Sequence, residues 1–265
     1  MRAQRPDQAS PSAGRLHGCT VVITRPAGTG QALARRLRAL GAVPILLPGL
    51  TLQGIPINPA LRRALRDALR DDLLLFSSPA AVRYAAALAP LRTRANVIAV
   101  GQGTARALRQ HGIPQPWVPQ RQDSEGVLAL PELQLLHGQR ISLIGADGGR
   151  GLLREQLVAR GAQLRELHVY RRVAPRLDRR HFEAALRLPI RASVLLSSAE
   201  ALQNLRALLP PPAWQSLTAA IAVVSSARLE QAAREAGFTR TLLAASAGAA
   251  DLIAAIKPAS SRNGC

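Results

Sequence analysis

Four short loops of small or hydroxyl-bearing residues follow apolar runs, and they are where this chain could bind an anion. The loops are Ser77-Ser78, Ser197-Ser198, GQGTAR (101–106) and GADGGRG (145–151). Such residues leave backbone N–H groups free at the start of the next helix, and the hydroxyls add further donors. Ligands of open α/β sheets bind beyond the carboxyl ends of the strands. The loops therefore predict a donor-lined cleft suited to carboxylates, with the alternative that Ser77 and Ser197 merely cap helices.

Tyrosine is scarce, and one of the two tyrosines could do chemistry. Tyr84 falls within a predicted helix, where packing explains it. Tyr170 ends the run LRELHVY (164–170), and its hydroxyl could donate a proton or a hydrogen bond into the cleft. The alternative is a partly buried tyrosine whose hydroxyl bonds to the backbone.

The sequence argues against several other chemistries. No two of its five histidines have the i, i+4 spacing of a helical ligand pair, and there is no HExxH or CxxC motif, so no metal is expected. There is no G-x-S-x-G nucleophile elbow. GQGTAR has only the first two glycines of the dinucleotide fingerprint, so it is a weak signal for NAD.

The elements that must position these loops are strands and helices in alternation. Nine short apolar runs are separated by Ala/Leu/Arg segments with helical period. The runs are 21–25, 43–48, 73–76, 97–100, 141–145, 164–170, 193–196, 221–224 and 241–245. Continuous apolar runs suit strands buried on both faces of a parallel sheet, and the alternation predicts α/β architecture.

The chain also repeats itself at an interval of 120 residues. Leu33, Leu37 and Gly41 return as Leu153, Leu157 and Gly161, and Ser77-Ser78 return as Ser197-Ser198. Two similar α/β units with a cleft between them are therefore expected. The glycines at 41, 112, 161 and 237 should follow helices with positive φ.

Composition narrows the class of protein. The chain has 265 residues, which suggests about two domains. Its 48% hydrophobic content supports packed cores, and it has neither a signal peptide nor a transmembrane run, so a cytoplasmic protein is expected. The net charge of +19 is spread over both halves, and aromatics are only 3%, which speaks against a nucleic-acid binder. A monomeric enzyme and a two-lobed, non-catalytic sensor of a small polyanion both remain open.

Seven segments together resemble the uroporphyrinogen-III synthase family over about residues 18–257. They are VVITRPAGTGQALARRLRALGA (21–42), LLLFSSPAAV (73–82), VIAVGQGTARALRQHGI (97–113), DSEGVLAL (123–130), GGRGLLREQLVARGA (148–162), VYRRVAP (169–175) and IAVVSSARLEQAAREAGF (221–238). The resemblance implies two doubly wound, flavodoxin-like domains joined by a two-stranded ladder. One domain would comprise 18–44 plus 176–257, the other 54–164, and the ladder 45–53 and 165–175. Residues 1–16 and 258–265 are expected to be disordered tails.

The resemblance also implies a reaction. The enzyme would close hydroxymethylbilane, a linear tetrapyrrole with eight carboxylates, to uroporphyrinogen III, inverting ring D and releasing water. Family members need no cofactor. The implied partner is this substrate, with a hand-off from hydroxymethylbilane synthase and with no nucleic acid or membrane. Since the free substrate closes spontaneously to isomer I, catalysis would consist mainly of orientation.

The resemblance also implies roles for individual residues of this chain. Tyr170 matches the tyrosine that donates a proton to the leaving hydroxyl. The expected substrate-binding residues are Arg25, Ser77, Ser78, Gly101, Thr104, Arg150, Ser197, Ser198, Ser225 and Ser226. A basic residue that some members carry after the Ser-Pro turn is Ala80 here, so that carboxylate contact is absent.

Overall fold

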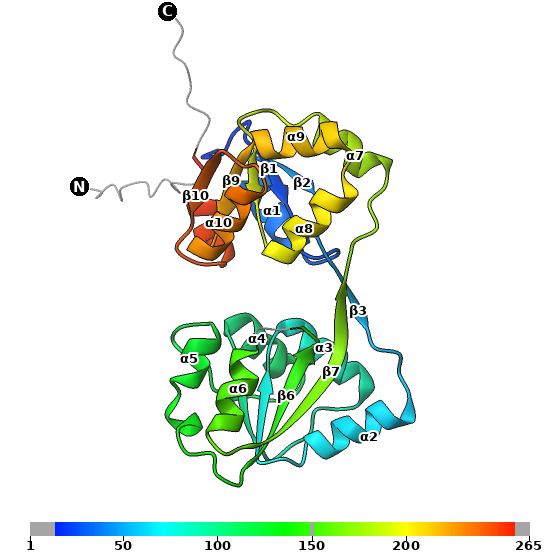
Figure 1. Ribbon diagram of the computed structural model, residues 1–265, viewed down its shortest axis with the longest axis vertical. Coiled ribbons are helices and arrows are strands. Elements are labelled where there is room, and N and C mark those ends of the chain that lie inside the picture. Colours follow the sequence, from blue (N-terminus) through cyan, green and yellow to red (C-terminus); the bar gives the residue numbers. More distant parts are fainter. Residues whose placement is uncertain (1–13, 149–150, 258–265) are drawn as a thin grey trace, which may run out of the picture. The chain divides into compact units, whose positions relative to one another are not determined.

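The computed structural model describes residues 14–148 and 151–257, in which strands and helices alternate (Figure 1). Arg150 and most of the two predicted tails lie outside the described residues. Residues 14–16, assigned to the N-terminal tail from sequence, form a turn in which Leu16 is fully buried and donates its N–H to Leu40 O. None of the described helices is long and apolar enough to cross a membrane.

The chain divides into two compact units. One joins the residues up to Thr51 with those from Val173 onward, and the other is Leu52–Arg172. Both boundaries fall inside strands, β3 (Thr51–Gly54) and β7 (Gln163–Val173), which are hydrogen-bonded neighbours in one sheet. Residues 45–46, placed by the resemblance in the ladder, instead belong to strand β2. The domain limits implied by the resemblance, and the cleft between the domains, stay predictions.

The first unit is built on a five-stranded sheet with the order β10-β9-β8-β1-β2, in which every pair is parallel. Its elements are β1 (Thr20–Ile23), α1 (Gln31–Ala39), β2 (Val43–Leu46), α7 (Arg179–Leu186), β8 (Ser193–Leu195), α8 (Ala199–Leu208), α9 (Pro211–Ala219), β9 (Ile221–Val224), α10 (Ala227–Glu235), β10 (Arg240–Leu243) and α11 (Ala249–Ala255).

The second unit is built on a sheet with the order β3-β7-β6-β4-β5, in which β7, β6, β4 and β5 run parallel. Besides β3 and β7, its elements are α2 (Pro59–Ala68), β4 (Leu73–Phe76), α3 (Pro79–Leu88), β5 (Asn96–Ala99), α4 (Gln102–Gln110), α5 (Ser124–Leu128), a 3₁₀ turn (Pro131–Leu133), β6 (Arg140–Ala146) and α6 (Leu152–Ala159).

Helices cover both faces of each sheet, which explains the continuous apolar strands. All four residues of β4 are buried. Leu74 and Phe76 pack into the core beneath α3 and α4, whereas Leu73 and Leu75 pack into the core beneath α5 and α6. Because side chains alternate along a strand, a strand covered on both faces needs no polar residue. The predicted α/β fold with doubly wound parallel sheets is confirmed.

The internal repeat has a structural counterpart. The 120-residue offset matches β1, α1 and β2 with β6, α6 and β7, and it matches β8 with β4. The matched strands take the same order in both sheets, β8-β1-β2 and β4-β6-β7, and β9 and β5 flank β8 and β4 on the same side. The glycines predicted to end helices have positive φ as expected, +84° at Gly41, +89° at Gly112, +85° at Gly161 and +107° at Gly237.

A candidate active site at the carboxyl edge of the second sheet

The second sheet has a switch point between β4 and β6. The chain leaves β4 into α3 on one face and leaves β6 into α6 on the other face. Because the two connections diverge, they leave a crevice outside the carboxyl ends of this strand pair. The loops after β4 and β6 carry Ser77-Ser78 and the GADGG segment, two of the loops that the sequence predicts to bind an anion.

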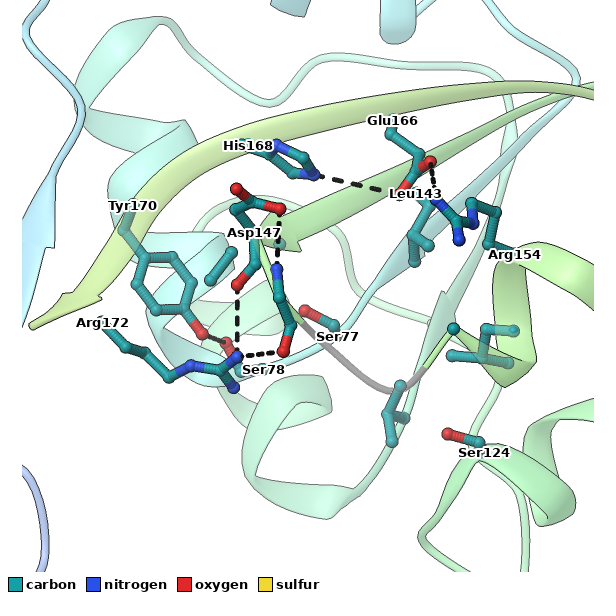
Figure 2. Close-up of a pocket in the computed structure, with 16 residues that line it drawn as sticks. Ser77, Ser78, Ser124, Leu143, Asp147, Arg154, Glu166, His168, Tyr170 and Arg172 are labelled. Carbon is teal, nitrogen blue, oxygen red and sulfur yellow. Dashed lines mark hydrogen bonds and ion pairs between the residues drawn. The ribbon is translucent and has the colours of Figure 1, made fainter. Parts of the chain in front are cut away.

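A cavity of about 510 Å³ lies at this crevice, and Figure 2 shows the side chains that line it. Its volume falls in the range of roughly 300–1,000 Å³ that is usual for small-molecule sites. The polar residues that line it are Ser77, Ser78, Ser124, Asp147, Arg154, Glu166, His168, Tyr170 and Arg172. The last four lie at every second position of β7, but a register shift between His168 and Tyr170 interrupts the alternation of faces there.

Tyr170 is held in this cavity by two residues of one helix. Its hydroxyl lies 3.0 Å from Ser78 Oγ, and its ring stacks on the ring of Tyr84, with 5.4 Å between centroids and 18° between planes. Ser78 is the N-cap of α3 and accepts the Ala81 N–H at 3.0 Å. Tyr84 donates its own hydroxyl to Leu52 O at 2.8 Å. The phenol oxygen thus lies beside the N-terminus of a ten-residue helix.

Ser77 lies beside a glycine whose missing side chain keeps this end of the strand pair open. The Ser77 N–H donates to Ile144 O, and its hydroxyl would clash with a Cβ at Gly145. The pairing of β6 with β7 also shifts register after Gly145, so that His168 and Tyr170 face successive residues of β6. Such bulges commonly re-aim side chains next to functional sites.

The rim of the cavity carries a group of charged side chains. Arg172 donates to the carbonyls of Asp147 and Gly148, holding the loop after β6 against β7. Glu166 lies 3.9 Å from His168 Nε2 and 4.0 Å from Arg154. These three side chains are partly exposed, so their ion pairs contribute little stability and leave them able to meet a charged ligand.

Two predicted residues of this unit do not line the cavity. Gly101 is the N-cap of α4, and the side chain of Gln122 lies over it and accepts the Gln102 N–H at 2.8 Å. Thr104 is in the same helix and is only 3% exposed. In this structure Thr104 is a core residue, and its role in binding stays a prediction.

In the first unit, side chains of the protein itself fill the space beyond the carboxyl ends of the matching strands β1 and β8. Thr24, which follows β1, corresponds to Ile144 of the other unit at the 120-residue offset. Its hydroxyl donates to Leu195 O at 2.9 Å and accepts the Ser197 N–H at 3.0 Å, while Ser197 Oγ donates to Thr24 O at 3.0 Å. The Ser197 hydroxyl is thus already engaged within the protein.

The remaining predicted residues of the first unit have mixed roles. Ser198 and Ser226 are the N-caps of α8 and α10. The alternative that serines cap these helices is therefore right for the second serine of each pair rather than for Ser197 or Ser77. Ser225 is half-buried before α10. Arg25 donates to Ala247 O at 3.2 Å, and burial lowers the pKa of its guanidinium.

Sequence reasoning missed most of the charged lining. Glu166, His168 and Arg172 lie close to Tyr170 on β7, and this closeness was the only signal in the sequence, because the register shift after Gly145 interrupts the alternation of faces. Asp147 was within the GADGGRG loop but was not singled out. Among the described residues, no group of three His, Cys, Asp or Glu side chains could hold a metal ion.

Proteins of known family resemble this chain over most of its length. Uroporphyrinogen-III synthase from Salmonella typhimurium is 35% identical over 232 residues, which cover 83% of this chain and 92% of the relative. The Escherichia coli enzyme of the same name is 34% identical over 230 residues, with the same two coverages.

Crystal structures of uroporphyrinogen III synthases share the fold. The Helicobacter pylori structure has a TM-score of 0.58 at 13% identity, covering 89% of this chain and 97% of that one. A mutant Thermus thermophilus structure has a TM-score of 0.57 at 23% identity, covering 85% and 92%.

A family model confirms the resemblance found in the sequence. The model described as uroporphyrinogen-III synthase HemD matches residues 31–254, well over half of the chain. The match spans residues of both units, including the loops after β4 and β6 that line the cavity. The chain therefore belongs to the uroporphyrinogen-III synthase family.

Proposed function

We propose that this chain is a cyclising lyase that converts hydroxymethylbilane to uroporphyrinogen III and water, with inversion of ring D. Family membership supports the reaction. The observation that carries the proposal is the Tyr170 hydroxyl, which lines a cavity at a switch point and is held against the N-terminus of α3 by Ser78. A phenol oxygen placed in this way can release a proton and then bear the resulting charge.

In the first chemical step the bond between the terminal carbon and its hydroxyl breaks. Tyr170 donates its proton to the leaving hydroxyl, water departs, and the remaining cation is an azafulvenium ion. The Ser78 hydroxyl can donate to the phenolate oxygen that forms, since its lone pairs already accept the Ala81 N–H. Ring D then attacks through its substituted carbon to give a spiro intermediate, which fragments and recloses with ring D inverted. A proton is lost at the final closure, so the balance is the loss of one water.

Binding would rest on donors around the cavity. Ser77 and Ser78 offer hydroxyl groups, and Arg154 and Arg172 add positive charge at the rim. The net charge of +19 would attract a substrate with eight carboxylates. Arg25, Gly101, Thr104, Arg150, Ser197, Ser198, Ser225 and Ser226 stay predicted contacts, as do a monomeric state and the hand-off from hydroxymethylbilane synthase.

The test is to generate hydroxymethylbilane in situ, add the purified chain without metal or nucleotide, oxidise the products, and separate isomers I and III by chromatography. Chain inactivated by heat serves as the control and should leave isomer I. Isomer III as the main product with the native chain would establish the activity. Isomer I alone from a folded chain would refute it and favour a non-catalytic binding protein.

A further inference from the structure

The first unit contains a second cavity, away from the paired Thr24 and Ser197. It has a volume of about 220 Å³ and lies beyond the carboxyl ends of β1 and β2, beside the start of α1 and of α7. The lining residues that could contact a polar ligand are Arg25, Gly28, Gly30, Gln31, Arg176 and His181.

Two guanidinium groups line this cavity, and no Asp or Glu is among its described lining residues. The imidazole of His181, which also lines it, is already paired with the Asp178 carboxylate at 2.6 Å, so the charge available to a ligand is that of the two arginines. Neither Arg25 nor Arg176 forms an ion pair with another described residue. The one described partner of Arg25 is the Ala247 carbonyl, at 3.2 Å. Arg25 is partly buried and Arg176 is exposed. A nearby anion offsets the cost of partly burying the Arg25 guanidinium, so the arrangement is suited to an anion supplied from outside.

Backbone N–H groups at the start of α1 add further hydrogen-bond donors with partial positive charge. Helix α1 begins after Gly30, which has no side chain to cap it, whereas serines cap α3, α8 and α10. A Cβ at Gly30 would come within 3.0 Å of Leu46 and 3.2 Å of Ile23, so the close packing of this turn calls for glycine. The first N–H groups of α1 therefore supplement the two arginines as donors to an oxyanion.

The size of the cavity limits what it could hold. Its volume of about 220 Å³ is below the roughly 300–1,000 Å³ of ordinary ligand sites. A whole tetrapyrrole does not fit such a space, but one carboxylate on a short chain does. Planar guanidinium groups also match the geometry of a carboxylate.

We propose that this cavity binds a carboxylate, which comes from one arm of the tetrapyrrole or from a small free acid. Only the first source rests on the proposed function. In either case Arg176 supplies charge from the exposed side and Arg25 from the buried side, with the start of α1 beneath the carboxylate.

The first experiment measures binding directly, with propionate as the probe. Sodium propionate is titrated into ¹⁵N-labelled full chain, with sodium chloride at equal ionic strength as the reference. The backbone amide signals of Gly28, Gly30 and Gln31 should move with propionate and not with chloride. In Arg176→Ala the dissociation constant should rise roughly three- to tenfold, the weaker part of the range for a charged hydrogen bond because Arg176 is exposed. Arg35→Ala is the matched control, since it removes one exposed arginine of the same unit outside the cavity.

The second experiment identifies the source of the carboxylate. If an arm of the tetrapyrrole occupies the cavity, Arg176→Ala raises KM for hydroxymethylbilane by the same factor and leaves kcat and the isomer ratio unchanged. If KM is unchanged while propionate binding is weakened, the occupant is a free acid. Equal shifts with chloride and propionate, or unaltered propionate binding in Arg176→Ala, would overturn the proposal. A wild-type chain that yields only isomer I would refute the proposed function, and the amide titration would still decide the cavity.

Discussion

Replacing Tyr170 by phenylalanine removes one oxygen atom and leaves the ring in place. The lost hydroxyl makes a single neutral hydrogen bond, to Ser78 at 3.0 Å. Such a bond contributes about 0.5–1.5 kcal/mol, which is small beside the roughly 5–15 kcal/mol that stabilises a typical domain. The ring keeps its stacking on Tyr84. Tyr170→Phe should therefore fold, and its melting temperature should fall by only a few degrees.

The catalytic loss should be much larger than the loss of stability. A positioned general acid accelerates a reaction by roughly 10²–10⁴-fold, which corresponds to about 2.7–5.5 kcal/mol of barrier. The assay follows the initial rate of isomer III formation from hydroxymethylbilane generated in situ, with melting temperature measured on the same samples. We expect the rate to fall at least about a hundredfold, and isomer I to accumulate because the unbound substrate closes by itself.

Tyr84→Phe is the matched control. It also loses one phenolic hydrogen bond, the 2.8 Å bond to Leu52 O, but Tyr84 is not among the residues that line the cavity. It should lose similar stability and keep a rate near that of wild type. A wild-type rate in Tyr170→Phe, or equal losses of rate in both variants, would show that Tyr170 acts through packing and not as an acid.

Three further variants test the surroundings of the site. Gly145→Ala should displace the Ser77 hydroxyl, because the new Cβ would clash with it. The rate should fall about tenfold or more with little change in melting temperature. An unchanged rate would mean that Ser77 does not contact substrate. Ser197→Ala should reduce the free energy of unfolding by only about 0.5–1.5 kcal/mol, because the hydrogen bond to Thr24 O is lost while that carbonyl still accepts the Gly49 N–H. The isomer ratio should stay that of wild type; denaturant titration and product analysis check this. The pKa of Asp72 is lowered chiefly because its carboxylate accepts the backbone N–H of Arg140 in β6. The stabilisation that this bond gives is therefore present above the unfolded pKa of about 4 and is lost as pH falls through the lower folded pKa. Asp72→Asn should flatten the dependence of the free energy of unfolding on pH in this acidic range, and a curve parallel to that of wild type would contradict the assignment.

The sequence by itself determined the elements and the family. Continuous apolar runs mark buried strands because side chains alternate and both faces of each sheet are covered, and each of the nine runs contains or overlaps a strand. The four repeated glycines were readable because only a local rule, the positive φ after a helix, decides their conformation. The strand β3 was not among these runs, since TLQG carries little apolar signal and is held by its pairing with β7.

Tertiary structure decided which loops form a site. The two units repeat the same strand order, yet Thr24 and Ser197 bond to each other in one while Gly145 leaves room beside Ser77 in the other. Tyr170 and Ser78 are 92 residues apart, and only the packing of α3 against β7 brings their hydroxyls to 3.0 Å. Local patterns specify helices and strands because their hydrogen bonds lie close in sequence or follow a short period. Which side chains meet at a switch point depends on sheet order and register, which no short segment contains.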